Sequence, residues 1–274
     1  MPEGPEIRRA ADGIAKALVG KPLADVFFAF PELTDYEDAL IGAVVAAVDT
    51  RGKAMLTRFD NGLTLYSHNQ LYGRWYTCKR DRPPSTKRSL RVALHTDTHS
   101  ALLYSASDVA MLTPETESEH PFLCRVGPDI LDATLTPAAV AKRLADKRFR
   151  NRSLGALYLD QTYLAGIGNY LRSEILFVSG EHPASRPADL DKAALRRLAK
   201  ATLDISRRSY RTKGVTVPDR LAKQLKADGQ TFQKYRFFAY GRNGKACHTC
   251  GTTIERMDVG SRGLYYCPRC QPMR

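Results

Sequence analysis

The sequence predicts an α+β protein of several domains: an N-terminal helix with an antiparallel β-sandwich, a helical domain, and a C-terminal zinc finger on a β-hairpin. Three observations lead to this prediction. Apolar residues at helical spacing open the chain, short β-rich runs follow, and two Cys-x-x-Cys pairs lie near the end. With 274 residues, 43% of them hydrophobic, the chain is long enough to bury a core in more than one domain.

The predicted N-terminal domain covers residues 1–125. Apolar residues recur at helical spacing over 5–18, and Gly20 is a typical stop for the helix that this pattern predicts. Residues 22–112 then hold short β-rich runs, which predict antiparallel strands in a sandwich or a barrel. The Asp-Asn-Gly sequence at 60–62 separates two of these runs and is typical of a two-residue hairpin.

The predicted middle domain, residues 126–230, is helical. A loop rich in Pro, Glu and Thr at 113–129 leads into it. The Thr-Pro pair at 136–137 is typical of a helix cap and first helical residue, and Ser153 is a candidate cap for a second helix. The polar stretch 211–230 predicts a loop or mobile linker to the last domain. Helical patterns begin at 137, at 154 (extending to 164), at 170 and at about 189.

Four cysteines near the end of the chain form two Cys-x-x-Cys pairs separated by sixteen residues. This spacing is typical of a structural zinc site with four thiolate ligands, and iron in a rubredoxin-like site is the alternative. A closed site of this kind organises the fold and leaves no position for catalysis, so we predict one structural Zn²⁺ in a finger at 231–274. Arg262 falls in the turn region of the expected hairpin, where an arginine is either solvated or a ligand contact. The predicted ligands are Cys247, Cys250, Cys267 and Cys270.

The chain carries 42 Lys and Arg against 29 Asp and Glu, a formal net charge of +13. Nucleic acid is the first expected partner, ahead of ribosomal, anionic-membrane or other acidic partners. Basic residues concentrate at 141–152 and in the last 34 residues, which predicts phosphate contacts there. We find no apolar run of bilayer length and no export signal, so we expect a cytoplasmic protein without a membrane partner. Cys78 and Cys124 are then expected to be buried free thiols.

Four segments and the finger together resemble the Fpg/Nei family of DNA glycosylases. The segments are PEGPE at 2–6, TRGK at 50–53, SHNQLYG at 67–73 and LAGIGNYLRSE at 164–174, and their order and spacing match along nearly the whole chain. The resemblance implies a helix and β-sandwich, a helix-two-turn-helix domain and a zinc finger. It also implies a monomeric bacterial base-excision-repair enzyme, a glycosylase and apurinic/apyrimidinic lyase, with damaged double-stranded DNA as its partner near the nucleoid.

The resemblance implies a role for four catalytic residues. Once Met1 is removed, Pro2 exposes a secondary amine that attacks deoxyribose C1′ and forms an iminium. Glu3 is the acid that protonates the departing base or the opening sugar, although a carboxylate there also suits the first turn of a helix. Lys53 is a general acid/base and phosphate contact, where a turn lysine is otherwise solvated. Arg262 clamps phosphates and serves the second elimination.

The resemblance also implies DNA contacts. Asn169 would bring a phosphate to a helix N-terminus, although a helix cap is the simpler role for an asparagine there. Arg125 would be a DNA-binding loop arginine. His68 would contact phosphate, or simply pack within a strand. Gln70, Leu71 and Tyr72 would fill the base stack left by a flipped nucleotide, or form the end of a sandwich strand.

The lesion class is the finer question. The QLY and PEGPE sequences resemble the endonuclease VIII branch, which acts on oxidised pyrimidines, so we expect pyrimidine removal followed by β- and δ-elimination. FAYGRNGKAC, at 238–247, is as similar to the branch that acts on oxidised purines. A purine glycosylase of the same family is therefore the alternative. A non-enzymatic DNA-binding protein is the rival from another class.

Overall fold

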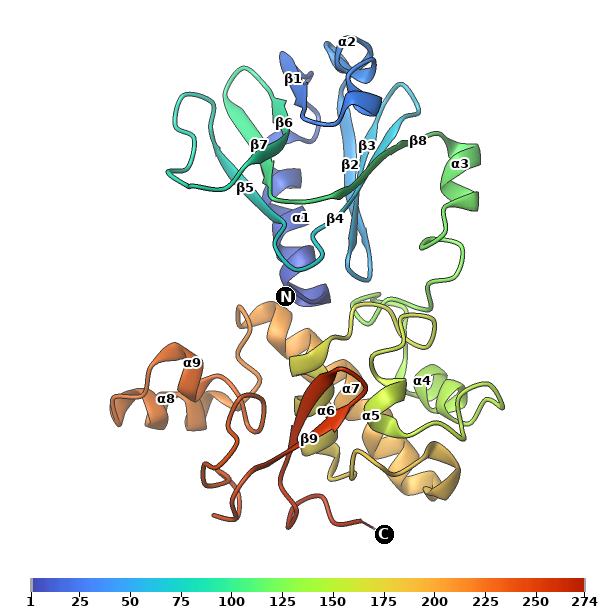
Figure 1. Cartoon of the computed structure of the whole chain (residues 1–274), viewed down its shortest axis with the longest axis vertical. Coiled ribbons are helices and arrows are strands. Elements are labelled where there is room, and N and C mark those ends of the chain that lie inside the picture. The colour runs from blue at the N-terminus through green and yellow to red at the C-terminus, as the bar shows by residue number, and fades with distance from the viewer. Residues whose placement is uncertain (1, 274) are drawn as a thin grey trace. The chain divides into compact units, whose positions relative to one another are not determined.

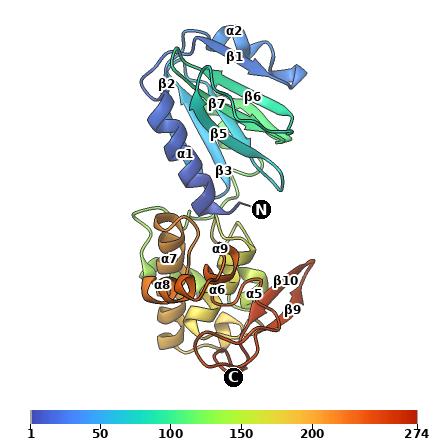
Figure 2. The ribbon, with the colours of Figure 1, turned by 90° about the vertical axis from the view of Figure 1, so that its left-hand side faces the viewer.

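The computed structural model describes residues 2–273 (Figures 1 and 2). Met1, whose removal the predicted chemistry requires, and Arg274, the last residue of the predicted finger, lie outside the described residues. The chain forms two compact units. Pro2 and residues 6–126 make up what we call the sandwich unit, and residues 3–5 with 127–273 make up the helical unit.

The strands of the sandwich unit form, within residues 2–273, two open four-stranded antiparallel sheets, as predicted. One sheet has the order β1-β6-β7-β5 and the other the order β2-β3-β4-β8, and Figure 1 shows α1 between them. The elements are α1 (Gly4–Leu18), β1 (Asp25–Phe28), η1 (Pro31–Leu33), α2 (Tyr36–Leu40), β2 (Val45–Arg51), β3 (Ala54–Phe59), β4 (Thr64–His68), β5 (Arg74–Lys79), β6 (Leu90–His95), β7 (His99–Tyr104), β8 (Asp108–Leu112) and α3 (Pro114–Glu119).

The apolar face of α1 completes the core of the sandwich unit. Ile7, Ala11, Ile14 and Leu18 are at most 2% exposed and pack in one cluster with residues of both sheets. Each fully buried Ile or Leu side chain stabilises the fold by about 1.5–3 kcal/mol. The predicted first helix is thus confirmed. Gly20 follows it at φ +76, in the left-handed conformation that ends helices.

Three details of this unit differ from the sequence prediction. The connection at 60–62 has three residues, because the Phe59 N–H donates to the Leu63 carbonyl while Gly62 takes φ +86. Strands β5 and β8 were not among the predicted runs. Polar residues interrupt the apolar pattern of β5, whereas β8 is a short apolar run after Asp108 that the prediction did not include. The predicted loop at 113–129 contains α3, which starts with the same Thr-Pro signal as 136–137: Thr113 accepts a hydrogen bond from the Thr116 N–H.

The helical unit is built around α6, whose buried face packs against α7 and β10 (Figure 2). The predicted start at 136–137 is confirmed, because Thr136 caps its helix by accepting from the Ala139 N–H. The helix expected from about 189 begins at Lys192, where Asp191 caps α7 by accepting from the Ala194 N–H. The elements are α4 (Pro137–Leu144), α5 (Leu154–Leu157), α6 (Asn169–Ser179), η2 (Pro187–Asp189), α7 (Lys192–Arg211), α8 (Asp219–Ala227), α9 (Phe232–Tyr235), β9 (Glu255–Val259) and β10 (Arg262–Tyr266).

Two expectations for the helical unit are wrong. The helix expected over 154–164 ends at Leu157, because Asp160 accepts hydrogen bonds from the N–H and hydroxyl of Thr162 and turns the chain. Ser153 precedes that helix but makes no capping bond through its side chain. The stretch 211–230, expected to be a loop or linker, contains α8. The Arg208 side chain holds this helix by donating to Asp219.

The two solitary cysteines differ from expectation as well. Cys78 is half-buried on β5, as a strand residue would be, but Cys124 is exposed, so the prediction that both are buried is wrong for Cys124. Cys124 lies in the turn that follows α3, where Phe122 and Leu123 take the apolar contacts instead. Across residues 2–273, no helix combines the length and apolarity needed to cross a membrane.

Candidate functional site

The side chain of Glu3 is buried in the helical unit, where it is 2% exposed. Its carboxylate accepts hydrogen bonds from the backbone N–H groups of Gly168 (2.7 Å), Tyr170 (2.8 Å) and Leu171 (3.2 Å). These donors are the unpaired amides at the start of α6, and they stabilise the negative charge of the carboxylate. Glu3 therefore caps a helix that begins more than 160 residues later.

Two glycines make room for this arrangement. A Cβ on Gly168 would lie 2.4 Å from Cδ of Glu3, so a larger residue cannot stand there without moving the carboxylate. The Gly4 N–H donates to the Gly166 carbonyl at 2.8 Å, and Gly166 has φ +100, a conformation that favours glycine. The Gly-Ile-Gly turn thus anchors residues 3 and 4 of the chain.

Asn169 lies at the first position of α6, next to the capped amides. Its side-chain amide donates to the Gly263 carbonyl at 2.8 Å, and its oxygen accepts from Arg172. The side chain therefore does not cap its own helix; it ties the helix to β10, directly beside Arg262. Whether Asn169 also contacts phosphate stays a prediction.

Arg172 is fully buried beneath these residues. Besides Asn169, it donates to the Gly155 carbonyl at 2.7 Å, and its Nε has no partner among residues 2–273. Burial and, to a smaller extent, repulsion from Arg262 lower the pKa of Arg172 to about 10, against the opposing effects of Glu3 and Tyr240. Glu3, Asn169, Arg172 and Arg262 thus interact within the helical unit. Sequence reasoning missed Arg172, although it lies three residues after Asn169 on the same helical face.

In the sandwich unit, Lys53 occupies the tight turn between β2 and β3, as predicted. Gly52 takes φ +65 in this turn, and Lys53 is only 7% exposed, unlike the usual turn lysine. His68, at the end of β4, pairs in register with Ala54, the residue next to Lys53. Burial lowers the pKa of His68; Asp108 opposes this effect, and Lys53 adds to it. Lys53 and His68 therefore form one polar group at this end of the sheet.

The Gln70–Tyr72 loop follows directly. Leu71 is 56% exposed and Tyr72 is 67% exposed, which is unusual for large apolar side chains. The Gly73 N–H donates to the Asn69 carbonyl at 2.7 Å, and this bond closes the loop. The alternative prediction, that QLY is the end of a sandwich strand, is wrong, because β4 ends at His68 and β5 begins at Arg74.

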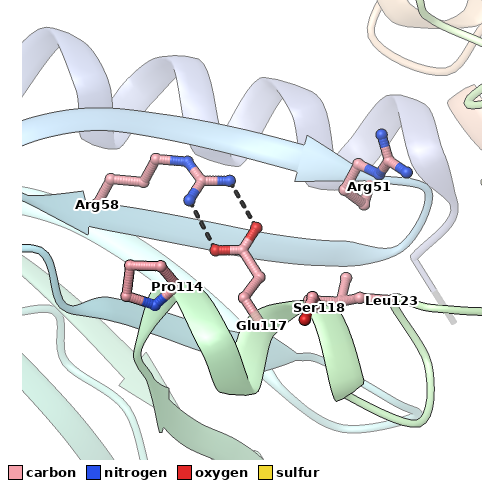
Figure 3. Close-up of a pocket in the computed structure, with 6 residues that line it drawn as sticks. All are labelled: Arg51, Arg58, Pro114, Glu117, Ser118 and Leu123. Carbon is pink, nitrogen blue, oxygen red and sulfur yellow. Dashed lines mark hydrogen bonds and ion pairs between the residues drawn. The ribbon is translucent and has the colours of Figure 1, made fainter.

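Arg125 is exposed in the segment that follows α3. Figure 3 shows how α3 is held: Arg58 of β3 makes a paired hydrogen bond with Glu117, at 2.8 and 2.9 Å. The pocket drawn there is lined by Arg58, whose guanidinium already donates hydrogen bonds to Glu117 and Asp49. Phe122 then packs edge-on against His68, with ring centroids 5.8 Å apart. The segment carrying Arg125 is thereby anchored on the sheet of Lys53 and His68.

The four predicted zinc ligands meet at one point of the helical unit. Their sulfur atoms lie within 4.8 Å of one another, with neighbouring pairs at 3.5–3.9 Å. These distances exceed a disulfide bond and match the edge of a tetrahedron around zinc, about 3.8 Å for Zn–S bonds of about 2.3 Å. Each knuckle also supplies an N–H to sulfur: Thr249 donates to Cys247, and Cys270 donates to Cys267. The residues fit a structural zinc ion.

Pro2 is half-exposed and precedes α1. It belongs to the sandwich unit, while the next residue, Glu3, is anchored in the helical unit. The structure thus brings the predicted residues together in two groups. Lys53 and His68 interact in the sandwich unit, and Glu3, Asn169 and Arg262 interact in the helical unit.

Comparison with known proteins covers nearly the whole chain. Residues 1–107 match the formamidopyrimidine-DNA glycosylase N-terminal domain, residues 126–226 its H2TH domain, and residues 244–272 the zinc finger found in FPG and IleRS. Endonuclease 8 of Escherichia coli is 52% identical over 271 residues, covering 99% of this chain and 100% of that protein. Endonuclease 8 of Salmonella agona is 53% identical over 274 residues, with the same coverage.

Solved structures share the fold. The Lactococcus lactis Fpg bound to DNA containing an abasic site superimposes with a TM-score of 0.80 at 18% identity, covering 99% of this chain and 100% of that chain. The same protein in complex with DNA containing N7-benzyl-Fapy-dG gives 0.81 at 19% identity, with the same coverage.

Proposed function

Since this chain belongs to the Fpg/Nei family, it is a bifunctional DNA glycosylase and apurinic/apyrimidinic lyase of base excision repair, and we propose that it removes oxidised pyrimidines with the Pro2 amine as nucleophile. Damaged DNA is its substrate, and the zinc ion held by the four cysteines is structural. The proposed details are the lesion class, the role of each side chain, action as a monomer, and a place in the bacterial cytoplasm at the nucleoid.

The observation that carries the Pro2 proposal is the anchoring of the two residues that follow it. Glu3 binds three backbone amides of the 168–171 segment, and Gly4 binds the Gly166 carbonyl. A nucleophile works best when its position is fixed before the substrate arrives. Pro2 is one peptide bond from this anchor, which supports a defined position for its nitrogen.

The proposed reaction starts at the secondary amine of Pro2, freed by removal of Met1. Its lone pair forms a bond to C1′ while the C1′–base bond breaks and the base leaves with the electron pair and a proton. Opening of the sugar ring leaves a cationic iminium between Pro2 and C1′. Loss of the C2′ proton then breaks the C3′–O bond, and a second elimination breaks the C5′–O bond. Hydrolysis of the iminium releases Pro2.

Glu3 is proposed to act beside this amine. Because three N–H groups stabilise its charge, the carboxylate suits the positive sugar and iminium electrostatically and suits a proton relay between the two eliminations. Proton delivery to the opening sugar requires that one of these hydrogen bonds be given up. We therefore assign Glu3 first to stabilisation of positive charge and second to proton transfer.

Lys53 and Arg262 are proposed to serve the phosphates and the eliminations. Lys53 is buried beside His68, so it has few rotamers and a defined direction. Arg262 starts β10, and the bond from Asn169 to Gly263 fixes the backbone at the next residue. The zinc ion supplies only stability to this hairpin. His68, Arg125 and Asn169 are the further proposed phosphate contacts.

Gln70, Leu71 and Tyr72 are proposed to fill the vacated base stack. Exposed apolar side chains on a closed loop have the shape and chemistry of an intercalating wedge. Separating stacked bases costs a few kcal/mol, which such side chains offset.

The oxidised-pyrimidine assignment is supported by the likeness to endonuclease 8 over the whole chain. The fold alone does not favour it, because one Lactococcus lactis Fpg has been solved with a Fapy-dG lesion and with an oxidised pyrimidine. The purine glycosylase remains the second candidate, because of the sequence at 238–247. The non-enzymatic alternative is wrong, because the chain is 52% identical to an endonuclease 8.

Lesion preference is tested by borohydride trapping on duplexes that carry thymine glycol, dihydrouracil, 8-oxoguanine or an abasic site. We expect covalent adducts with the abasic site and both pyrimidines, formed at least tenfold faster than with 8-oxoguanine. Faster trapping on 8-oxoguanine would favour the purine enzyme instead.

A further inference from the structure

The side chains of His68 and Ser107 hold the Gln70–Tyr72 loop, a role that the proposed function does not give them. The backbone N–H of Gln70 donates to Nδ1 of His68 at 3.1 Å, and the hydroxyl of Ser107 donates to Oε1 of Gln70 at 3.0 Å. His68 ends β4, and Ser107 lies between β7 and β8. The first residue of the loop is thus held through both its backbone and its side chain.

Gln70 needs this support because its backbone is strained. Its φ is +47, in the left-handed region that L-residues other than Asn, Asp and Gly rarely adopt. Space for the turn comes from Gly73, where a Cβ would lie 2.6 Å from the Asn69 carbonyl oxygen. Strain of this kind persists only when the surroundings oppose relaxation, and it is common at functional loops.

The bond to Gln70 requires a neutral His68. Because the N–H is the donor, Nδ1 must carry the lone pair, and the proton of the neutral ring is on Nε2. Three groups face the ring: Asp108, paired with His68 in register on β8; Lys53, on the β2–β3 turn; and the uncharged ring of Phe122. Burial lowers the pKa of His68. Asp108 raises this pKa and Lys53 lowers it, and the net lowering favours the neutral ring.

We propose that neutral His68 and Ser107 hold the Gln70–Tyr72 loop in the conformation that enters the base stack, so that both are positioning residues for base flipping. This inference rests on the proposed wedge function of the loop. The same tautomer leaves Nε2–H of His68 as a donor, so one ring links the wedge to a phosphate contact. Protonation of Nδ1 turns the acceptor into a donor and releases the loop.

The test follows unstacking directly, by stopped-flow fluorescence of 2-aminopurine placed next to dihydrouracil in a duplex. Enzyme is in saturating excess, so that a weakened phosphate contact does not enter the rate. Leu71→Ala is the reference for loss of the wedge. If Leu71→Ala leaves the unstacking rate unchanged, the wedge function itself fails, and this inference fails with it.

Ser107 is tested by a double-mutant cycle with Gln70. One lost hydrogen bond corresponds to about two- to tenfold in rate, so Ser107→Ala should slow unstacking by that factor. It should have no effect in a Gln70→Ala background, because its acceptor is gone. Additive effects of the two substitutions would contradict the proposal while leaving the wedge function standing.

His68 is tested by its pH profile. In wild-type protein, unstacking should slow as the pH falls and Nδ1 is protonated. His68→Asn should unstack the base faster than His68→Leu at neutral pH and should lose this pH dependence, because an Asn side chain accepts an N–H two residues on and does not titrate. His68→Leu should be slow at every pH. If His68→Asn keeps the wild-type profile, or His68→Leu equals His68→Asn, the positioning role is wrong.

Discussion

The carboxylate of Glu3 accepts a hydrogen bond of 2.8 Å from the backbone N–H of Tyr170, 167 residues later in the chain. With Gly168 and Leu171 as further donors, it fixes the start of the chain on the first turn of α6. The LAGIGNY sequence therefore serves the N-terminal residues of its own chain. An external phosphate would compete with Glu3 for these amides.

Replacement of Gly168 should disable both activities together. Gly168→Ala puts a Cβ 2.4 Å from Cδ of Glu3, so the carboxylate must leave its three donors. Hydrogen bonds to a charged group contribute about 1.5–3 kcal/mol each, so we expect a lower unfolding temperature and at least tenfold slower base release and strand cleavage. Single-turnover assays and thermal unfolding measure these changes.

Gly13→Ala is the matched control. Its Cβ would meet Thr77 at an ordinary 3.7 Å, within α1. This substitution should stabilise the protein by about 1 kcal/mol and leave the rates unchanged. Equal behaviour of the two variants would show that Glu3 does not depend on Gly168.

Asn169 should affect the two eliminations unequally. Asn169→Asp keeps an acceptor for Arg172 but cannot donate to Gly263, so β10 loses its tie while Arg172 stays paired. We expect base release near the wild-type rate and an accumulation of β-elimination product over δ-product, seen on sequencing gels. Asn169→Ala should add a loss of about 1–3 kcal/mol in stability, because it leaves Arg172 underpaired. An unchanged ratio of β- to δ-elimination product in both variants would show that Asn169 has no role in the second elimination.

Zinc should be lost with any of its four ligands. Cys267→Ser removes a thiolate from the buried tetrahedron, and we expect less than one zinc per chain by elemental mass spectrometry, with loss of DNA binding. Cys124→Ser changes the exposed cysteine and should keep one zinc and full binding. Full zinc content in Cys267→Ser would contradict the assignment of this ligand.

The stability that the Arg58–Glu117 ion pair gives to α3 should depend on pH. Hydrogen bonding to Arg58 lowers the pKa of the Glu117 carboxyl, so the pair contributes stability above the unfolded pKa of about 4.3, and this is lost as the pH falls through the folded pKa. Because the pair is partly exposed, the contribution is below about 1 kcal/mol. Glu117→Gln should be less stable than wild type at pH 7 in urea unfolding, and the difference should shrink as the pH falls below the unfolded pKa and vanish once the pH is below the lowered folded pKa.

Glu119→Gln is the control for this ion pair. It removes the same charge from the same short helix without touching Arg58. Its unfolding midpoint should stay near wild type at both pH values. A larger effect for Glu119 than for Glu117 would mean that net charge, not the ion pair, holds α3.

Local sequence signals were enough to predict the zinc site and several of the helices. The spacing of the four cysteines indicated a tetrahedral site without help from the rest of the chain, and the apolar face of α1 followed from period alone. The start of α3 was also available locally, since Thr113-Pro114 repeats the signal at 136–137. By contrast, the helix expected over 154–164 failed because Asp160 competes for the backbone, which apolar periodicity does not show.

Long-range contacts could not be predicted in this way. No sequence pattern links Glu3 to the amides at 168–171, because tertiary folding alone brings them together. The left-handed backbone of Gln70 is similar, since its support comes from His68 and from Ser107, 37 residues away. These positions hold the proposed chemistry, and local rules are least informative there.

The central claim is that the Pro2 nitrogen forms the covalent bond to DNA. We expect the borohydride-trapped complex, digested with nuclease and trypsin, to carry its sugar remnant on the peptide that starts at Pro2 and ends at Arg8. Protein that retains Met1 should give no adduct, because its Pro2 nitrogen is an amide. A remnant on a lysine peptide, or equal trapping by the protein that retains Met1, would contradict the account.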